Sequence, residues 1–225
     1  MKVAFFSDVH GNIEALHAMV SASADCEARF CAGDLVGYGD RPNEVIEWIR
    51  ESGTTTVIGN HDLFALDELK YKAERDDIYR ASWTKAELKP GNLEWLRTLP
   101  KSLSLDLDGR KINLTHASPW DVQTYLYPDS DHLQRAMPTD DSTLVVGHCH
   151  HAFVCPGPSG VIVNCGSAGF PRSGPAGAQF MVLDTTTGSW TFRVAQYDIA
   201  TVANRLREAG WNSDVIQRLV DPTKR

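Results

Sequence analysis

Aspartate, asparagine and histidine side chains of the kind that bind metal ions recur in five short segments of the sequence. The segments are Asp8-Val9-His10, Gly33-Asp34, Gly59-Asn60-His61-Asp62, His116 and Gly147-His148-Cys149-His150. Carboxylate, amide and imidazole ligands without thiolate suit Mn, Fe, Co, Ni or Zn, and they do not distinguish among these metals. One such segment alone is weak evidence, because a solitary Asp-x-His is most often a solvated loop. The five together favour a metal centre.

The spacing within two of these segments predicts which side chains lie on the same side of the chain. Side chains two residues apart in an extended chain point to the same side. We therefore expect Asp8 and His10 to share one side of the chain, and His148 and His150 to share one side. Cys149 lies between the two histidines and would then point the opposite way. We therefore do not expect Cys149 to be a ligand.

Each segment follows a stretch of sequence that is typical of a β-strand. Strands expected at 2–6, 28–32 and 54–58 alternate with helices that begin near Asn12 and at Pro42, which is the pattern of parallel βαβ units. Further strands are expected at 111–115 and 144–146, directly before His116 and Gly147. Sheets of this kind place their sites at the carboxyl ends of the strands, where all five segments lie.

The rest of the chain divides into a helical part and a strand-rich part. Residues 62–99 have helical periodicity that is interrupted at Pro90-Gly91, and they form either a helical pair packed on the sheet or a cap over the site. Asp108-Gly109 predicts a hairpin between strands at 103–107 and 111–115. No linker or repeat divides the sequence, so we expect one domain over 1–225. Other expected elements are strands at 153–155, 161–164, 179–184 and 190–197 and helices at 199–209 and from 213.

Composition excludes several classes of protein. Hydrophobic residues make up 42% and charged residues 23% of the chain, which is typical of a globular protein rather than a disordered one. The net charge of −7 disfavours a general nucleic-acid-binding protein. No apolar run approaches the roughly 18 residues of a membrane helix, so no membrane partner is expected. The five cysteines contain no CxxC pair and no signal peptide precedes them, so we expect reduced thiols and a cytoplasmic location.

The ordered set of segments resembles the calcineurin-like metallophosphoesterase superfamily. The family pattern Asp-x-His, Gly-Asp, Gly-Asn-His-Asp/Glu, His, Gly-His-x-His is present in full order from Asp8 to His150. The sequences at 33–39, 42–45 and 164–167, followed by Pro171-Arg172, resemble the small single-domain prokaryotic-type branch. The resemblance implies a four-layer αββα sandwich of two mixed β-sheets covered by helices.

The resemblance also implies two divalent metal ions and assigns their ligands. One metal would be held by a set that comprises Asp8, His10, Asp34 and His150. The other would be held by a set that comprises Asp34, Asn60, His116 and His148. The carboxylate of Asp34 would bridge the two ions, and the metals themselves would be Mn, Fe, Ni, Co or Zn.

The catalytic residues implied by the resemblance are His61 and Asp62. A hydroxide that bridges the metals would attack phosphorus in line with the leaving oxygen. His61 would protonate that oxygen or donate a hydrogen bond to it, and Asp62 would orient the His61 ring. Arg172 is interpreted as either a phosphate contact or a surface arginine. Tyr38 either lines the cleft or packs under its loop.

The expected activity is hydrolysis of small phosphodiesters, phosphomonoesters or nucleotides. A non-catalytic scaffold on the same fold is the main alternative, although all the expected ligands and His61 are present. A protein phosphatase is a second alternative, but residues 33–39 lack the aspartate-arginine pair of that group. A DNA-repair nuclease would require a larger chain and a basic groove. The residues that select the substrate are expected in 62–99 and 118–131, and monomer and small homo-oligomer both remain open.

Overall fold

Two five-stranded β-sheets form the centre of the computed structural model, which describes residues 1–224. The first sheet has the strand order β10-β9-β1-β2-β3 and the second has the order β4-β5-β6-β8-β7. The strands are β1 (Lys2–Phe6), β2 (Ala28–Cys31), β3 (Thr55–Thr56), β4 (Ser102–Leu107), β5 (Arg110–Thr115), β6 (Thr143–Val146), β7 (Ala152–Pro156), β8 (Val161–Cys165), β9 (Ala178–Asp184) and β10 (Ser189–Ala195). Each sheet is mixed. Strands β1, β2 and β3 are parallel, as are β5, β6 and β8, whereas β9, β10, β4 and β7 run antiparallel to their neighbours.

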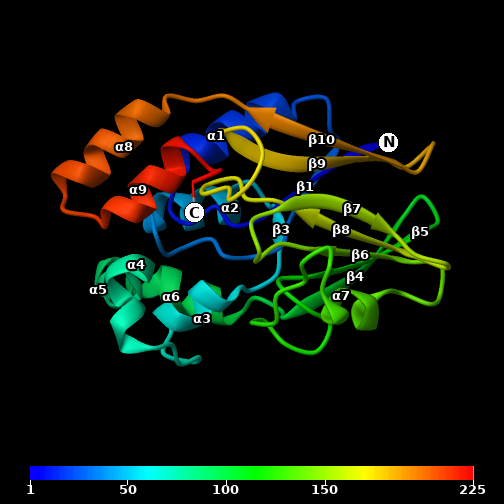
Figure 1. Cartoon of the computed structure of the whole chain (residues 1–225), viewed down its shortest axis with the longest axis horizontal. Helices are drawn as coiled ribbons and strands as arrows, with labels where there is room; N and C mark the ends of the chain where they lie inside the picture. The colour runs from blue at the N-terminus through cyan, green and yellow to red at the C-terminus, as the bar shows by residue number, and fades with distance from the viewer. Residues whose placement is uncertain (225) are drawn as a thin grey trace.

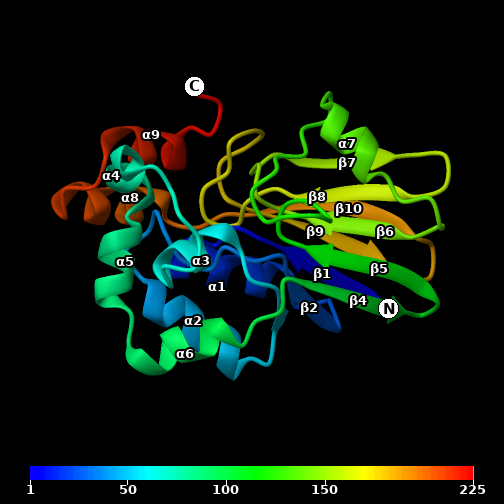
Figure 2. The same ribbon diagram turned by 90° about the horizontal axis from the view of Figure 1, so that it is seen from below.

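Helices cover the outer faces of both sheets (Figures 1 and 2). The helices are α1 (Ile13–Ala22), α2 (Pro42–Glu51), α3 (Asn60–Ala65), the 3₁₀ turn η1 (Ala73–Arg75), α4 (Asp76–Tyr79), α5 (Ala81–Glu87), α6 (Pro90–Arg97), α7 (Asp131–Ala136), α8 (Ile199–Glu208) and α9 (Ser213–Val220). Helices α1 and α2 pack on the first sheet, and α7 packs on the second. The predicted αββα sandwich is therefore confirmed. Within residues 1–224, no helix has the length and apolarity needed to span a bilayer.

Alternating side chains of β1 fill two different cores. Val3 and Phe5 point between the sheets, where they join Leu114 and Val163 of the second sheet. Ala4 and Phe6 point to the opposite face and pack against α1 and α2. This alternation is the two-residue period of a strand, and it fixes which face of β1 each sequence position occupies. The loop after β1 is thereby anchored at the edge of the first sheet.

Local sequence signals explain where several elements begin. The side chain of Asn12 caps α1 by accepting a hydrogen bond from the Ala15 amide at 3.1 Å. Pro42 and Pro90 occupy the first turns of α2 and α6, where a missing N–H costs no helix hydrogen bond. The hairpin predicted at Asp108-Gly109 joins β4 to β5, with φ angles of 56° and 81° at these residues.

Two expectations about the elements are wrong. The strand predicted at 54–58 pairs with β2 only over Thr55–Thr56, because the Ile58 amide donates instead to the Pro100 carbonyl at 2.9 Å. Residues 62–99 do not form a helical pair, since α3 to α6 and η1 divide the segment into short pieces. Its later part packs on the core of the first sheet through Leu93 and Leu96 of α6. Tyr79 of α4 instead contacts the candidate site described below.

Candidate metal centre

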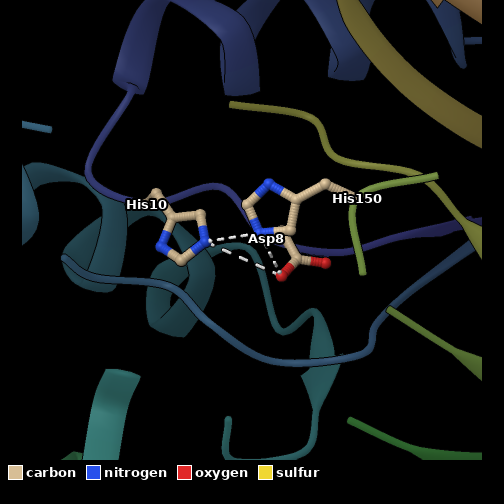
Figure 3. Close-up of side chains that lie close together, drawn as sticks. All are labelled: Asp8, His10 and His150. Carbon is tan, nitrogen blue, oxygen red and sulfur yellow. Dashed lines mark hydrogen bonds and ion pairs between the residues drawn. The ribbon is translucent and has the colours of Figure 1, made fainter. Parts of the chain in front are cut away.

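Asp8, His10 and His150 converge from the loops after β1 and β6. Figure 3 shows the three side chains pointing toward one another. The Oδ1 atom of Asp8 lies 3.7 Å from His10 Nε2 and 3.2 Å from His150 Nε2, and the two ring nitrogens lie 3.1 Å apart. All three residues are buried. We call them the first metal group.

Asp34, His116 and His148 form a second metal group beside the first, from the loops after β2, β5 and β6. His116 Nε2 lies 3.3 Å from Asp34 Oδ2 and 2.9 Å from the side-chain oxygen of Asn60. The same Asp34 Oδ2 lies 3.6 Å from His10 Nε2 of the first group. The Asp34 carboxylate is therefore shared between the two groups.

A backbone carbonyl fixes the ring of every histidine in the two groups. Three Nδ1 atoms bond to carbonyls and leave Nε2 directed into the groups: His10 to Val36 at 2.8 Å, His116 to Ala32 at 2.8 Å, and His150 to Phe170 at 2.6 Å. In His148 it is Nε2 that bonds a carbonyl, that of Gln123 at 2.9 Å, which leaves Nδ1 free. Such contacts hold a metal-binding histidine in one tautomer and one orientation.

The charges of the two groups fit bound cations. Within residues 1–224, the buried atoms Asp8 Oδ1 and Asp34 Oδ2 have no hydrogen-bond partner. A buried carboxylate oxygen without a partner costs on the order of 1–3 kcal/mol or more, so a counter-charge is needed there. A divalent cation on each group supplies that counter-charge. The residues present therefore fit two metal ions.

Protonation of the metal-free groups follows from burial and from neighbouring charges. Burial lowers the pKa of His148 to about 3 and, with the nearby Arg172 charge, lowers the pKa of His150 to about 4. Burial also disfavours charge on His116, but the Asp34 carboxylate outweighs it and raises the pKa of His116 to about 9. His148 and His150 are thus neutral near pH 7, which is the form that binds metal.

The expectation that His148 and His150 face the same side of an extended chain is wrong. Their backbone φ angles are 65° and 60°, and those of Asp8 and His10 are 56° and 51°, all in the left-handed region. His148 lies in the second group and His150 in the first. This division is the one that the family resemblance implies.

Asp62 does not contact the His61 ring as expected. Its two oxygens accept hydrogen bonds of 2.9–3.1 Å from the backbone amides of Asp34, Leu35, Val36 and Gly59. Buried Asp62 therefore joins the loop after β2 to the start of α3, and it positions Asp34 through the backbone. Both carboxylate oxygens are occupied by these four amide donors and not by the His61 ring.

The His61 ring is held by aromatic packing and close backbone contact. Its centroid lies 4.9 Å from that of His10 and 4.8 Å from those of Tyr38 and Tyr79. Its buried Nδ1 has no hydrogen-bond partner within residues 1–224 and lies 2.6 Å from where a Cβ on Gly37 would be. Burial lowers the pKa of His61, so the ring is neutral in the metal-free protein. Nε2 is the nitrogen left to face a substrate.

Tyr38 and Arg172 both lie beside the first group. The buried Tyr38 ring is 4.6 Å from His10, and its hydroxyl accepts a hydrogen bond of 3.0 Å from Arg172. The Arg172 amide donates to the His150 carbonyl at 3.0 Å, and the side chain is half-buried rather than on the open surface. Tyr38 and Arg172 therefore both border the first group.

Three further residues border the groups and carry no sequence motif. Tyr125 stacks on His148 with a centroid distance of 4.1 Å and an interplanar angle of 23°. Tyr79 packs on His61, and Ser7 donates a hydrogen bond to Asp8 Oδ2. For Tyr125 the sequence offers only its place in 118–131, and for Tyr79 the helical spacing to Trp83 within 62–99 favours core packing.

Comparison with known proteins relates this geometry to a family. The model of the calcineurin-like phosphoesterase superfamily domain matches residues 1–188. An uncharacterized protein of Methanocaldococcus jannaschii is 32% identical over 232 residues, which cover 92% of this chain and 94% of that protein. The crystal structure of a metallophosphoesterase from Sphaerobacter thermophilus is 28% identical, covers 97% of this chain and 98% of that one, and superposes with a TM-score of 0.81.

A more distant relative has a named activity. A symmetrical bis(5'-nucleosyl)-tetraphosphatase of Pectobacterium atrosepticum is 32% identical over 140 residues, which cover 56% of this chain. The match covers 47% of that protein, so the chain aligns with about half of the relative's length.

Proposed function

The chain belongs to the calcineurin-like phosphoesterase superfamily, and we therefore propose that it hydrolyses small phosphodiesters, phosphomonoesters or nucleotides with two divalent metal ions. Asp8, His10, His150 and Asp34 hold one ion. Asp34, Asn60, His116 and His148 hold the other. Mn, Fe, Co, Ni and Zn all suit these ligands.

The observation that carries this proposal is the position of Asp34 Oδ2 between the two groups. It lies within 3.6 Å of a histidine nitrogen on either side and is buried without a hydrogen-bond partner among residues 1–224. An oxygen in this position suits a carboxylate that bridges two cations. Two divalent cations, when bound, would neutralise the phosphoryl oxygens of a substrate and lower the pKa of a water at the centre.

His61 is proposed to donate a hydrogen bond or proton to the departing oxygen. The packing of Nδ1 against Gly37 directs Nε2 away from that loop, and the ring lies directly beside His10. A donor held in this way stabilises negative charge on the leaving group without having to reorient. Asp62 supports the reaction indirectly by holding the backbone on either side of Asp34 and at Gly59.

Substrate contacts are proposed for Arg172 and for the walls of the centre. Arg172 lines a hollow together with His150, and its guanidinium suits a phosphoryl oxygen. Tyr38, Tyr79 and Tyr125 supply aromatic surface beside the metal groups. The name of the Pectobacterium relative supports nucleotides among the substrates of this chain. We also propose that residues 1–225 form one domain whose segment 62–99 borders the active site.

Elemental analysis followed by hydrolysis assays tests the proposal. We expect about two metal equivalents per chain after loading with Mn²⁺, and metal-dependent hydrolysis of bis(p-nitrophenyl) phosphate or p-nitrophenyl phosphate. The ratio of the two rates separates a diesterase from a monoesterase. A metal-loaded protein that hydrolyses no ester in a broad panel would favour the non-catalytic scaffold.

A further inference from the structure

A cavity of about 570 Å³ lies beside the metal centre, and Arg172 is its one lining residue with a role proposed above. Its walls include Arg172, Ser173 and His151 from the segments that flank His150 and Phe170. Arg218 of α9, Lys224 and Tyr127 line it as well. The cavity therefore joins loops of the metal centre to the last helix of the chain.

The wall of this cavity is positively charged in an acidic protein. Arg172, Arg218 and Lys224 contribute three cations, and no aspartate or glutamate among residues 1–224 lines the cavity. The whole chain has a net charge of −7, so this concentration of positive charge is a local feature. Within the described part of the chain, neither arginine lies within 4.0 Å of a carboxylate oxygen. Two half-buried arginines without ion pairs are available to an anionic ligand.

A small hollow lies beside both the cavity and the first metal group. Arg172 and Arg218 line this hollow together with His150 and Tyr38. Arg172 and Arg218 also line the larger cavity, so two arginines border both spaces. An anion held by Arg172 and Arg218 would therefore lie next to a phosphate at the metal centre.

We propose that Arg172, Arg218 and Lys224 form a subsite for a second phosphate group of the substrate. The inference rests on the proposed phosphoester hydrolysis and narrows its substrates to molecules with at least two phosphates. Arginine recognises phosphate through paired N–H donors, and lysine adds a point charge. The second phosphate is either the next member of a phosphoanhydride chain or a separate phosphate ester on the same molecule.

Competition and calorimetry on the Mn²⁺-loaded protein test the subsite. The probes are AMP, ADP and adenosine 3',5'-bisphosphate, with Mn²⁺ in excess so that the nucleotides do not strip the centre. We expect ADP or the bisphosphate to bind on the order of 10- to 100-fold more tightly than AMP, as charged hydrogen bonds to a second phosphate predict. Tighter ADP binding identifies the anhydride chain, and tighter bisphosphate binding identifies the separate ester. Equal affinity for all three probes would overturn the inference.

Variants of two arginines show whether the tighter binding of ligands with two phosphates arises in the cavity. Arg218→Ala should abolish the preference for the second phosphate, and Arg218→Lys should restore part of it. Arg207→Ala is the matched control, because Arg207 is exposed on α8 and lines a different hollow. A preference that survives in Arg218→Ala would contradict the assignment. If the wild type hydrolyses no ester the proposed function fails, whereas calorimetry with the same probes still decides the subsite.

Discussion

Five of the seven residues assigned to the metal ions have a left-handed backbone although none of them is glycine. Their φ angles lie between 51° and 65°, at Asp8, His10, Asp34, His148 and His150. A left-handed conformation costs an L-residue roughly 1–2 kcal/mol, and it persists only where the surrounding structure holds it. Here carbonyl contacts and the four amide bonds of Asp62 hold the loops. The proposed ligands are therefore held in place by the fold itself.

Asp34→Asn should weaken binding of both metal ions. The substitution removes the charge from the one carboxylate that approaches both groups. Asp8→Asn is the comparison, because Asp8 belongs to the first group alone and should mainly affect one ion. Mass spectrometry of the metal content after dialysis measures how many ions each variant retains. Two retained equivalents in Asp34→Asn would refute a shared ligand.

His61→Ala should lose about 10²–10⁴-fold in turnover while it keeps both metals. His61 lies beside His10 but belongs to neither metal group, so its loss should affect the leaving-group step and not metal binding. Steady-state hydrolysis of bis(p-nitrophenyl) phosphate and metal analysis of the same sample measure the two effects. His17→Ala, an exposed histidine on α1, should behave like the wild type. Unchanged turnover in His61→Ala would remove His61 from the mechanism.

At the scale of elements, the centre depends on a close approach between loops of the two sheets. Gly147 follows β6 of the second sheet and packs directly against Ser7 and Asp8, which follow β1 of the first. A Cβ at position 147 would lie 1.7 Å from Ser7 Oγ and 2.5 Å from Asp8 Oδ2. The His148 amide, next in the chain, donates to Asp8 Oδ2 at 3.0 Å. Glycine at 147 thus allows the two sheet edges to share one site.

Gly147→Ala should destabilise the fold by about 1–3 kcal/mol and weaken metal binding. The added methyl group must displace Ser7 and Asp8, and Asp8 is a proposed ligand. Gly91→Ala is the matched control, because a Cβ there meets nothing within 4 Å and Gly91 lies in α6. The control should be neutral or up to about 1 kcal/mol more stable. Thermal unfolding and metal titration of both variants measure the two effects. Equal stability and equal metal affinity in Gly147→Ala and Gly91→Ala would contradict the close packing at Gly147.

At the scale of the whole molecule, the last two helices are tied to the start of the chain. Arg205 of α8 donates to Glu14 of α1 at 2.6 Å and to Asp40, in the loop before α2, at 2.6 Å. Trp211 donates to the carbonyl of Tyr38, a wall of the metal centre. Figure 2 shows α8 and α9 at the same end of the molecule as α4 and α5. This arrangement brings Arg218 of α9 to the centre.

Arg205→Ala should lower the free energy of unfolding by about 1–2 kcal/mol near neutral pH, because it breaks partly exposed charged hydrogen bonds. Burial opposes the charge of Glu14, but the Arg205 hydrogen bond outweighs it and holds the pKa of Glu14 below 4.5. A carboxylate whose pKa is lower in the folded than in the unfolded state stabilises the fold at pH values above its unfolded-state pKa. This stabilisation is lost as the pH falls through the folded-state pKa.

The loss of unfolding free energy in Arg205→Ala, relative to the wild type, should therefore become smaller below pH 4.5. Urea unfolding at neutral and acidic pH measures it, with exposed Arg207→Ala as the control on the same helix. An equal deficit at both pH values would exclude Glu14 as the titrating partner.

The sequence by itself determined the features that depend on near neighbours along the chain. The cap at Asn12, the turn at Asp108-Gly109 and the alternation of Val3 and Phe5 with Ala4 and Phe6 follow from local geometry and period. The chemical type of the proposed metal ligands also follows from sequence, because residue types at strand ends are visible without a fold. The strand predicted at 54–58 is an exception among these local features, because the Ile58 amide bonds the distant Pro100 carbonyl and the strand ends early.

Only the tertiary structure decided which of these groups meet. His148 enters the second group and His150 the first, and each ring bonds the carbonyl of a residue distant in sequence, Gln123 or Phe170. Asp62 bonds to backbone amides on the neighbouring loop rather than to His61, and Arg218 reaches the cavity of Arg172 from a helix near the end of the chain. These outcomes depend on how two sheets and their covering helices pack. Packing brings together residues far apart in sequence, and local periodicity carries no information about such contacts.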